Sequence, residues 1–414
     1  METKISLIML CRAVIVGCVV WGSVIEAFIV RKDFQVESSD AKLSTLQLAD
    51  KYGYRAEAHQ VVTDDGYLLE LHRITGSGST IYEKRLPPVL LMHGLLASSA
   101  DWLLIGVGHA LAYQLSDMGY DVWLGNARGN RYSRKHVKLT PDMDQFWNFS
   151  WHEIAVYDLP AMIDYVLNIT GKERLHYLGH SQGTTTFFVM ASVKPEFNEK
   201  IIFMQALAPV AYVEHVKSPL LNYFVKHMGV VSAIVELFGI SEFKPIPGII
   251  LELAKMLCPT SQANNLCVNI LFLLTGDDPE QVDPNIIPIL LGHIPAGSAT
   301  RQILHYGQEI LSGRFRQYDH GKIKNRFVYG QEEPPRYNLT AVTVPVALYY
   351  GANDYLSQTG DVQRLAKELP NLVGYHRVES DSFNHMDFLV AKDVDKLLYR
   401  LLIDNIEKYS SEDD

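Results

Sequence analysis

The stretch Gly179-His180-Ser181-Gln182-Gly183 decides the fold of this chain of 414 residues. An apolar run typical of a strand precedes it at residues 174–178, and residues 184–191 suit a helix. In that setting a Gly-x-Ser-x-Gly pattern places its serine on a sharp turn between strand and helix. Both glycines have a steric role, because each lets the two backbones approach where a Cβ atom would clash. The stretch therefore predicts Ser181 as a nucleophile, with Gly179 and Gly183 shaping the turn.

A base and an acid are required next, because a serine hydroxyl is a weak nucleophile until a base removes its proton and a third group orients that base. With a nucleophile on such a turn, the acid and then the histidine follow later in the chain. Residues 344–350 have the pattern of a buried strand, and Asp354 comes just after it. Another strand is expected at residues 372–378, and the polar loop after it carries His385. We expect Asp354 to be the acid and His385 the base.

Three other polar residues compete for roles in this site. Asp381 and Asp387 lie nearer the predicted base in the sequence. A triad acid normally comes from the end of a different strand, which favours the earlier aspartate. His93 could be interpreted as a catalytic or metal-binding group, but its position beside Gly94 suits a residue that shapes the loop.

Two backbone N–H groups are needed to hold the negative charge that develops on the attacked carbonyl oxygen. On this type of turn one donor is the residue after the nucleophile, and the other lies in the loop after an early strand. The apolar strand at residues 88–92, which ends in His-Gly, supplies that loop. We expect the donors of this oxyanion hole to be Leu95 and Gln182.

With these residues in place, the chain resembles the acid lipases of the α/β-hydrolase fold, the family of gastric and lysosomal acid lipases and their insect relatives. The resemblance covers nearly everything after the first few dozen residues. It implies a mostly parallel sheet flanked by helices, an esterase acting on neutral lipids, and catalytic and oxyanion-hole roles for the residues assigned above. Ala127 is a small departure, since many relatives carry serine there. Four further motifs carry the resemblance: Asp65–Leu69, Leu91–Leu95, Asn126–Asn130 and Tyr157–Ala161.

The start of the chain predicts a secretory signal peptide, residues 1–27, cleaved between residues 22 and 27. Lys4 precedes an apolar run that is best developed from Ala13 to Trp21. That run is short for a spanning helix, Arg12 interrupts it, and no later apolar stretch reaches the necessary length. We therefore expect a protein of the secretory pathway, extracellular or lysosomal, without a transmembrane anchor.

Cysteine usage agrees with secretion. Cys11 and Cys18 would leave with the signal peptide, so Cys258 and Cys267 would remain. The compartment and the family resemblance imply a disulfide between this pair, and two buried thiols are the alternative.

Sequons for N-glycosylation also fit an extracellular or lysosomal protein. Ser150, within the first of them, begins Ser-Trp-His-Glu, so it could instead form a capping box with Glu153 and start a helix. The expected glycosylation sites are Asn148, Asn168 and Asn338.

The motif positions divide the chain into an interrupted α/β core, residues 28–213 and 342–414, and an insertion, residues 214–341. Alternation of strand-like and helix-like segments stops and resumes at these boundaries. Apolar helices beside an esterase site predict a cap that walls in acyl chains and touches lipid, although a second core is the alternative. No sequence feature demonstrates a movable lid. Within the insertion, helices are expected at Leu220–Ile240, Ile249–Leu257, Leu266–Leu274 and Ala299–Leu311.

Charge excludes some partners. The net charge of −10 argues against nonspecific nucleic-acid binding and gives no reason to expect attraction to anionic membranes, so lipid contact would be mainly apolar. The basic stretch Arg128–Lys138 is most simply a solvated loop. The sequence contains no phosphate-binding glycine loop and no cluster of metal ligands, so we expect no metal site and no cofactor.

These features predict a serine lipase that hydrolyses neutral lipid esters at a lipid-water interface, with triacylglycerols and cholesteryl esters as substrates. A sterol-ester or small-ester carboxylesterase and an acyltransferase on the same fold are the alternatives, and an intact triad disfavours a non-catalytic lipid carrier. Family likeness implies acidic operation. That raises a difficulty, because Asp354 favours protonated His385 whereas a base must be neutral. The pH optimum and the oligomeric state stay open.

Overall fold

The computed structural model describes residues 39–77, 86–243 and 271–413. The expected signal peptide, the Cys258 and Cys267 pair and the expected helix at residues 249–257 lie outside the described residues. Those three expectations therefore remain predictions.

A central sheet of nine strands, counted over the described residues, has the order β1-β2-β4-β3-β6-β7-β10-β11, with β5 paired to β2. The pairs β1-β2 and β2-β4 are antiparallel, and the strands from β4 to β11 run parallel. Every residue of β3, β4, β6, β7 and β10 is buried, as expected for parallel strands covered on both faces. The predicted α/β-hydrolase sheet is confirmed. The strands are β1 Tyr54–Val62, β2 Tyr67–Ser77, β3 Pro88–Met92, β4 Asp121–Leu124, β5 Lys135–His136, β6 Leu175–His180, β7 Ile201–Leu207, β10 Val346–Tyr350 and β11 Leu372–Arg377.

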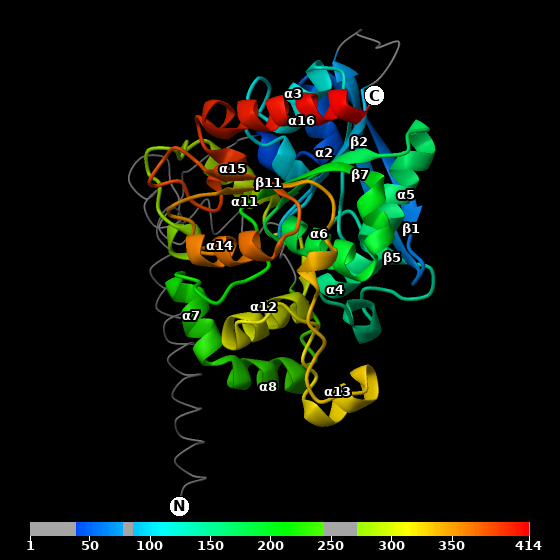
Figure 1. Cartoon of the computed structure of the whole chain (residues 1–414), viewed down its shortest axis with the longest axis vertical. Coiled ribbons are helices and arrows are strands. Elements are labelled where there is room, and N and C mark those ends of the chain that lie inside the picture. Colours follow the sequence, from blue (N-terminus) through cyan, green and yellow to red (C-terminus); the bar gives the residue numbers. More distant parts are fainter. Residues whose placement is uncertain (1–38, 78–85, 244–270, 414) are drawn as a thin grey trace, which may run out of the picture.

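Helices cover both faces of this sheet (Figure 1). Leu90 and Met92 of β3 pack into the core under α4, α5, α6 and α14, whereas Val89 and Leu91 pack into the core under α2, α3 and α16. Glu153 accepts a hydrogen bond from Ser150 N–H at 2.6 Å, which confirms the capping box at the start of α4. These helices are α2 Thr45–Lys51, α3 Leu111–Asp117, α4 Trp151–Glu153, α5 Leu159–Thr170, α6 Gln182–Val193, α14 Thr359–Glu368, α15 Asp387–Val390 and α16 Arg400–Asp413, with π-helical turns at Ile154–Asp158 and Asp395–Tyr399.

Between β7 and β10 the chain leaves the sheet. Figure 1 shows α7, α8, α12 and α13 gathered at one end of the molecule, away from α3 and α16. Among the described helices no single one is long and apolar enough to cross a membrane; α7 and α8 together pass by length and composition, across a bend of 72°. The elements of this segment are α7 Pro219–Lys226, α8 Met228–Phe238, the strand β8 Glu242–Phe243 paired with β9 Ser298–Ala299, α11 Ile286–His293, α12 Thr300–Ser312 and α13 Lys322–Tyr329.

The helices of this segment match the expectations only in part. The predicted helix Ala299–Leu311 agrees with α12 to within a residue, and of Leu266–Leu274 the described part is helical. The single helix expected over residues 220–240 is wrong, because the chain breaks at His227 and turns Met228 onto α12. A Cβ at Gly307 of α12 would lie only 1.6 Å from Met228 Cε, a fit that helical periodicity does not reveal.

Helix α11 is not among the helices expected in the insertion. Pro288 lies in the first turn of α11, where a missing N–H donor costs little.

A buried ion pair joins three of the motifs that carried the family resemblance. Arg128 Nε lies 2.6 Å from Asp158 Oδ1, and its Nη2 atom lies 2.8 Å from Asp65 Oδ1. The guanidinium also stacks 4.0 Å from the ring centre of Tyr67. The pair ties the turn before β2, the loop after β4 and the start of α5 together. The expectation of a solvated loop over residues 128–138 is therefore wrong at two places. Arg128 is buried, and Lys135–His136 form the strand β5.

Replacement of Arg128 by Met should lower the free energy of unfolding by about 3–5 kcal/mol, because it leaves two carboxylates without their buried partner. Chemical denaturation measures this loss. The control is Arg326→Gln in α13, which breaks the exposed pair with Glu332 and should cost no more than about 1 kcal/mol. Equal losses in the two variants would contradict a structural role for the buried pair.

Candidate active site

Ser181 occupies a strained turn between β6 and α6. Its φ of 53° lies in the left-handed region, which costs a non-glycine residue on the order of 1–3 kcal/mol. The turn needs its flanking glycines, because a Cβ on Gly183 would lie 2.3 Å from the Met92 carbonyl oxygen. A Cβ on Gly179 would lie 2.7 Å from the Gly183 carbonyl oxygen. The close packing of the α6 backbone against β3 keeps Ser181 in this strained conformation.

The structure brings the three expected residues together from the loops after β6, β10 and β11. His385 Nε2 lies 2.8 Å from Ser181 Oγ, and its Nδ1 atom lies 2.8 Å from Asp354 Oδ2. Asp354 is fully buried, and its Oδ1 atom accepts the N–H groups of Leu356 and Ser357, each at 2.8 Å. These bonds leave Oδ2 free to face the imidazole. The arrangement can pass a proton from the serine to the histidine.

The two competing aspartates have other partners. Asp381 is exposed and pairs with Arg377, while Asp387 Oδ2 accepts the Asn384 N–H at 2.7 Å. Neither carboxylate occupies the position of Asp354 beside the imidazole.

The loop after β3 lies directly beside the serine. A Cβ on Gly94 would lie 3.2 Å from Ser181 Cβ, so the backbone of this loop approaches the serine closely at Gly94. His93 Nε2 accepts the Ala127 N–H at 3.1 Å, so Nδ1 carries the ring proton and donates to the Gly94 carbonyl at 2.7 Å. Burial lowers the pKa of His93 to about 4, which keeps the ring neutral.

That contact orients the peptide between Gly94 and Leu95. Because a trans peptide directs its C=O and N–H in opposite directions, a Gly94 carbonyl fixed on His93 turns the Leu95 N–H away from that ring. Gln182 supplies the first N–H of α6, which has no partner within its helix. Ala127 contacts His93 through its backbone N–H, so alanine in place of serine at this position leaves that hydrogen bond intact.

Three supporting residues were missed from the sequence. His180 Nε2 donates to the His385 carbonyl at 3.0 Å, and burial keeps the pKa of His180 well below its ordinary value. The Thr275 carbonyl accepts the His385 N–H at 3.3 Å, and the Ala296 N–H donates to Leu96 in the loop after β3 at 2.6 Å. His180 could have been found from its place in the Gly-x-Ser-x-Gly motif. The other two contacts use only backbone atoms, which leave no trace in a sequence.

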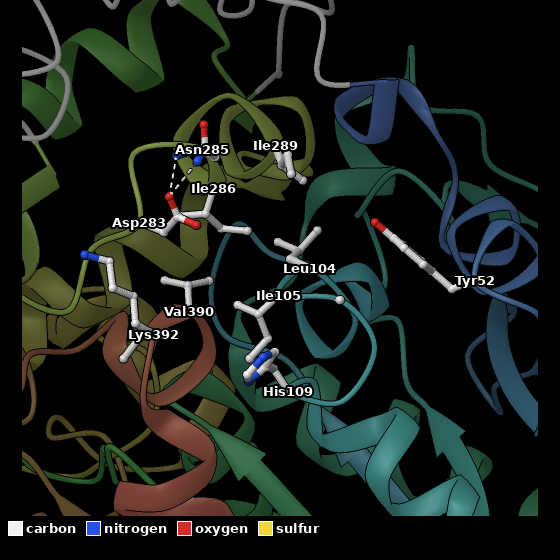
Figure 2. A pocket seen from close by; sticks show the side chains of 12 residues that line it. Tyr52, Leu104, Ile105, His109, Asp283, Asn285, Ile286, Ile289, Val390 and Lys392 are labelled. Atoms are coloured by element: carbon white, nitrogen blue, oxygen red, sulfur yellow. Dashed lines mark hydrogen bonds between the residues drawn. The ribbon is translucent and has the colours of Figure 1, made fainter. Parts of the chain in front are cut away.

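A pocket of about 280 Å³ lies outside this hydrogen-bonded array (Figure 2). Leu104, Ile286 and Val390 line it together with Asp283 and Lys392, and Ser181, Asp354 and His385 do not. Over the described ranges, no group of three or more His, Cys, Asp or Glu side chains could hold a metal ion.

Comparisons with known proteins agree with the fold and the motifs. A model of a partial α/β-hydrolase lipase region matches residues 45–106, and a model of the α/β-hydrolase fold matches residues 87–231. The chain is 46% identical to "Lipase 1" of Drosophila melanogaster, over 89% of this chain and 81% of that protein. It is 40% identical to "Gastric triacylglycerol lipase" of Homo sapiens, over 90% of this chain and 92% of that protein. A soluble variant of the monoglyceride lipase of Saccharomyces cerevisiae shares the fold, with a TM-score of 0.50 and 14% identity over 84% and 96% of the two chains.

Gly183→Ala should destabilise the protein by at least about 1–3 kcal/mol or abolish folding, because the new methyl group overlaps the Met92 carbonyl. Gly229→Ala in α8 is the matched control, since a Cβ there has nothing within 4 Å. It should leave stability unchanged or raise it by about 0.5–1 kcal/mol. Thermal unfolding of the two variants measures the difference, and a Gly183→Ala protein as stable as the wild type contradicts the packing described here.

Proposed function

Because this chain belongs to the acid lipase family of the α/β-hydrolase fold, and is a carboxylic ester hydrolase, we propose that it is a serine lipase acting through an acyl-enzyme on Ser181. The observation that carries the proposal is the continuous hydrogen-bonded array of Ser181, His385 and Asp354. Triacylglycerols are the expected substrates, as the name of the human relative suggests, and cholesteryl esters are a second neutral class.

In the proposed reaction Ser181 Oγ attacks the ester carbonyl while its proton passes to His385 Nε2, 2.8 Å away. Asp354 accepts a hydrogen bond from the Nδ1–H group, stays ionised and stabilises the imidazolium. The tetrahedral intermediate collapses as His385 returns the proton to the leaving alcohol, and the acyl group stays on the serine. Water, deprotonated by the same histidine, then releases the fatty acid and restores the enzyme.

We assign the oxyanion hole to the backbone N–H groups of Leu95 and Gln182. Within the described part of the chain, neither group donates a hydrogen bond to another residue. Loss of one such donor in a serine hydrolase costs about 2.7–4 kcal/mol of transition-state stabilisation. His93 supports the first donor through the Gly94 carbonyl.

We assign residues 214–341 to a cap that contacts lipid and residues 28–213 and 342–414 to the hydrolase core. The support is an apolar surface on α7, α8 and α13: Leu237 is 78% exposed and Phe327 86%. Side chains of this size on a protein surface mark a site of contact with apolar partners. With a net charge of −10, the attraction to a neutral lipid phase is apolar. Other exposed apolar residues of this surface are Leu220, Tyr223, Val230, Ile234, Phe238, Ile323 and Val328.

We place the protein in the secretory pathway, as an extracellular or lysosomal enzyme with a cleaved signal peptide within residues 1–27. The three sequon asparagines, Asn148, Asn168 and Asn338, are all exposed, which supports their glycosylation. The disulfide between Cys258 and Cys267 belongs to the same proposal.

Fatty-acid release from emulsified triacylglycerol, emulsified cholesteryl ester and a soluble short-chain ester tests the function, with the purified wild type beside three variants. Ser181→Ala should lower kcat by on the order of 10⁶. Asp354→Asn should lower it by about 10⁴, because the imidazole loses the partner that holds its tautomer. Asp381→Asn removes an exposed carboxylate outside the array and should keep the wild-type rate. Release that persists in Ser181→Ala would exclude the proposed mechanism, and release confined to the soluble ester would exclude a lipase.

The apolar surface has its own test. Leu237→Ser with Phe238→Ser should lower hydrolysis of emulsified triacylglycerol by tenfold or more and leave soluble-ester hydrolysis unchanged, since a Leu or Phe side chain gains about 1.5–3 kcal/mol on leaving water. Val62 is an exposed apolar residue at the end of β1, so Val62→Ser is the control and should leave the hydrolysis of both substrates unchanged. Equal losses on both substrates would show damage to the catalytic site instead of lost lipid contact.

A further inference from the structure

The segment between β7 and β10 meets the candidate active site through its backbone at residues 275–277. The Thr275 carbonyl oxygen accepts two hydrogen bonds, one from the His385 N–H at 3.3 Å and one from the Tyr355 N–H at 3.2 Å. His385 is the proposed base, and Tyr355 directly follows the proposed acid, Asp354. A single carbonyl group of this segment therefore ties the loop of the base to the loop of the acid.

The next two residues of the segment hold the other side of the acid. Gly276 has a φ of +105°, and a Cβ there would lie 2.0 Å from the Asn353 carbonyl oxygen, so its backbone packs directly on the residue before Asp354. Asn353 Nδ2 donates to the Asp277 carbonyl at 2.8 Å. Glycine alone suits this position, because a side chain would be strained by the positive φ and would overlap the Asn353 carbonyl.

A second stretch of the same segment holds Tyr355 from its other side. The Lys217 N–H donates to the Tyr355 carbonyl at 2.9 Å, so both backbone polar groups of Tyr355 bond to the segment. Ser218, the N-cap of α7, donates its hydroxyl to the Leu273 carbonyl at 3.0 Å, two residues before Thr275. The acid loop is therefore held by two stretches of chain that are bonded to each other.

The acid and base loops are also joined to each other and to the nucleophile turn. The Asn353 N–H donates to the Phe383 carbonyl at 3.2 Å. His180, the residue before the nucleophile, donates its Nε2 proton to the His385 carbonyl at 3.0 Å. Both backbone polar groups of His385 thus bond to residues outside its own loop, the carbonyl to His180 and the N–H to Thr275.

We propose that Asn353 and Gly276 are positioning residues, which hold the acid loop against residues 275–277 so that Asp354 and His385 keep their alignment. The proposal rests on the proposed serine-hydrolase function of the site. Proton transfer requires the imidazole within hydrogen-bond distance of both Ser181 Oγ and Asp354 Oδ2, and each of these contacts is 2.8 Å. A misplacement on the order of 1 Å can cost about 10²-fold in rate. Loss of the contact with residues 275–277 would therefore slow the chemistry without removing a reacting side chain.

Asn353→Ala tests the side-chain bond to the Asp277 carbonyl. On a soluble short-chain ester, kcat should fall by about two- to tenfold, as for the loss of one hydrogen bond, while KM stays unchanged. The matched control is Asn371→Ala, just before β11, because the Asn371 side chain likewise donates to a backbone carbonyl, that of Thr343, at 2.9 Å. The control should keep the wild-type kcat, and the two variants should have similar melting temperatures.

Gly276→Ala tests the backbone contact. The new methyl group would displace the Asn353 carbonyl, so kcat should fall by about tenfold to 10²-fold, again without a change in KM. Gly53→Ala is the control, because its φ of +82° imposes the same kind of backbone strain but a Cβ there has nothing within 4 Å. It should lose stability and keep the wild-type kcat, which separates displacement of the acid loop from strain.

A spectroscopic readout needs no turnover. The proton that His385 Nδ1 donates to Asp354 gives a low-field proton NMR resonance, which is identified by its loss in Asp354→Asn. In Asn353→Ala this resonance should move upfield or broaden, because the hydrogen bond between base and acid is loosened. It should stay unchanged in Asn371→Ala, and the displacement in Asn353→Ala should also appear in a Ser181→Ala background.

A wild-type kcat and an unshifted resonance in Asn353→Ala would overturn the proposal, whether or not Gly276→Ala folds. Equal losses of kcat in Asn353→Ala and Asn371→Ala would also overturn it, since they would show a general loss of stability. A rise in KM alone would do the same, because it would show a contact with the substrate. Failure of the proposed function gives a different result: no Ser181-dependent hydrolysis at any pH, with the resonance still displaced in Asn353→Ala.

Discussion

The contact between the start of α6 and the end of β3 is the constraint on which the site depends. At Gly183 the Met92 carbonyl oxygen approaches to 2.3 Å from the place a Cβ would take, which is possible only without a side chain. This approach holds Ser181 at a φ of 53° and sets Gly94 beside it. The nucleophile and both proposed oxyanion donors therefore share one rigid junction, and His385 must be brought to it from a loop about 200 residues later in the sequence.

The segment between β7 and β10 contributes much of the support for that histidine and its neighbours. It holds the base loop and the acid loop through the Thr275 carbonyl, and the loop after β3 through the Ala296 N–H. A cap that contacts lipid would thus also align the reacting groups. In physical terms, the proposed cap and the loops that orient the imidazole would form one packed unit. A change in the first can then alter the rate of the chemistry without touching a catalytic side chain.

The sequence could predict those features that have local or side-chain signatures. The order of Ser181, Asp354 and His385, the strands before them and the capping box at Ser150 all follow from motif and periodicity, and the structure places these elements as expected. The break at His227 could not be predicted, because it depends on the packing of Met228 against Gly307, where there is no room for a side chain. The same holds for the Thr275 and Ala296 contacts, which use backbone atoms of residues far from the motifs they support.

The most direct test of the account is to trap the covalent intermediate. The wild type is mixed with a long-chain p-nitrophenyl ester, quenched in acid within the first turnovers, digested and mapped by mass spectrometry. The account predicts one acyl adduct, on the peptide that contains Ser181, formed at the rate of the p-nitrophenol burst. Turnover without an adduct, or an adduct on another residue, would contradict it.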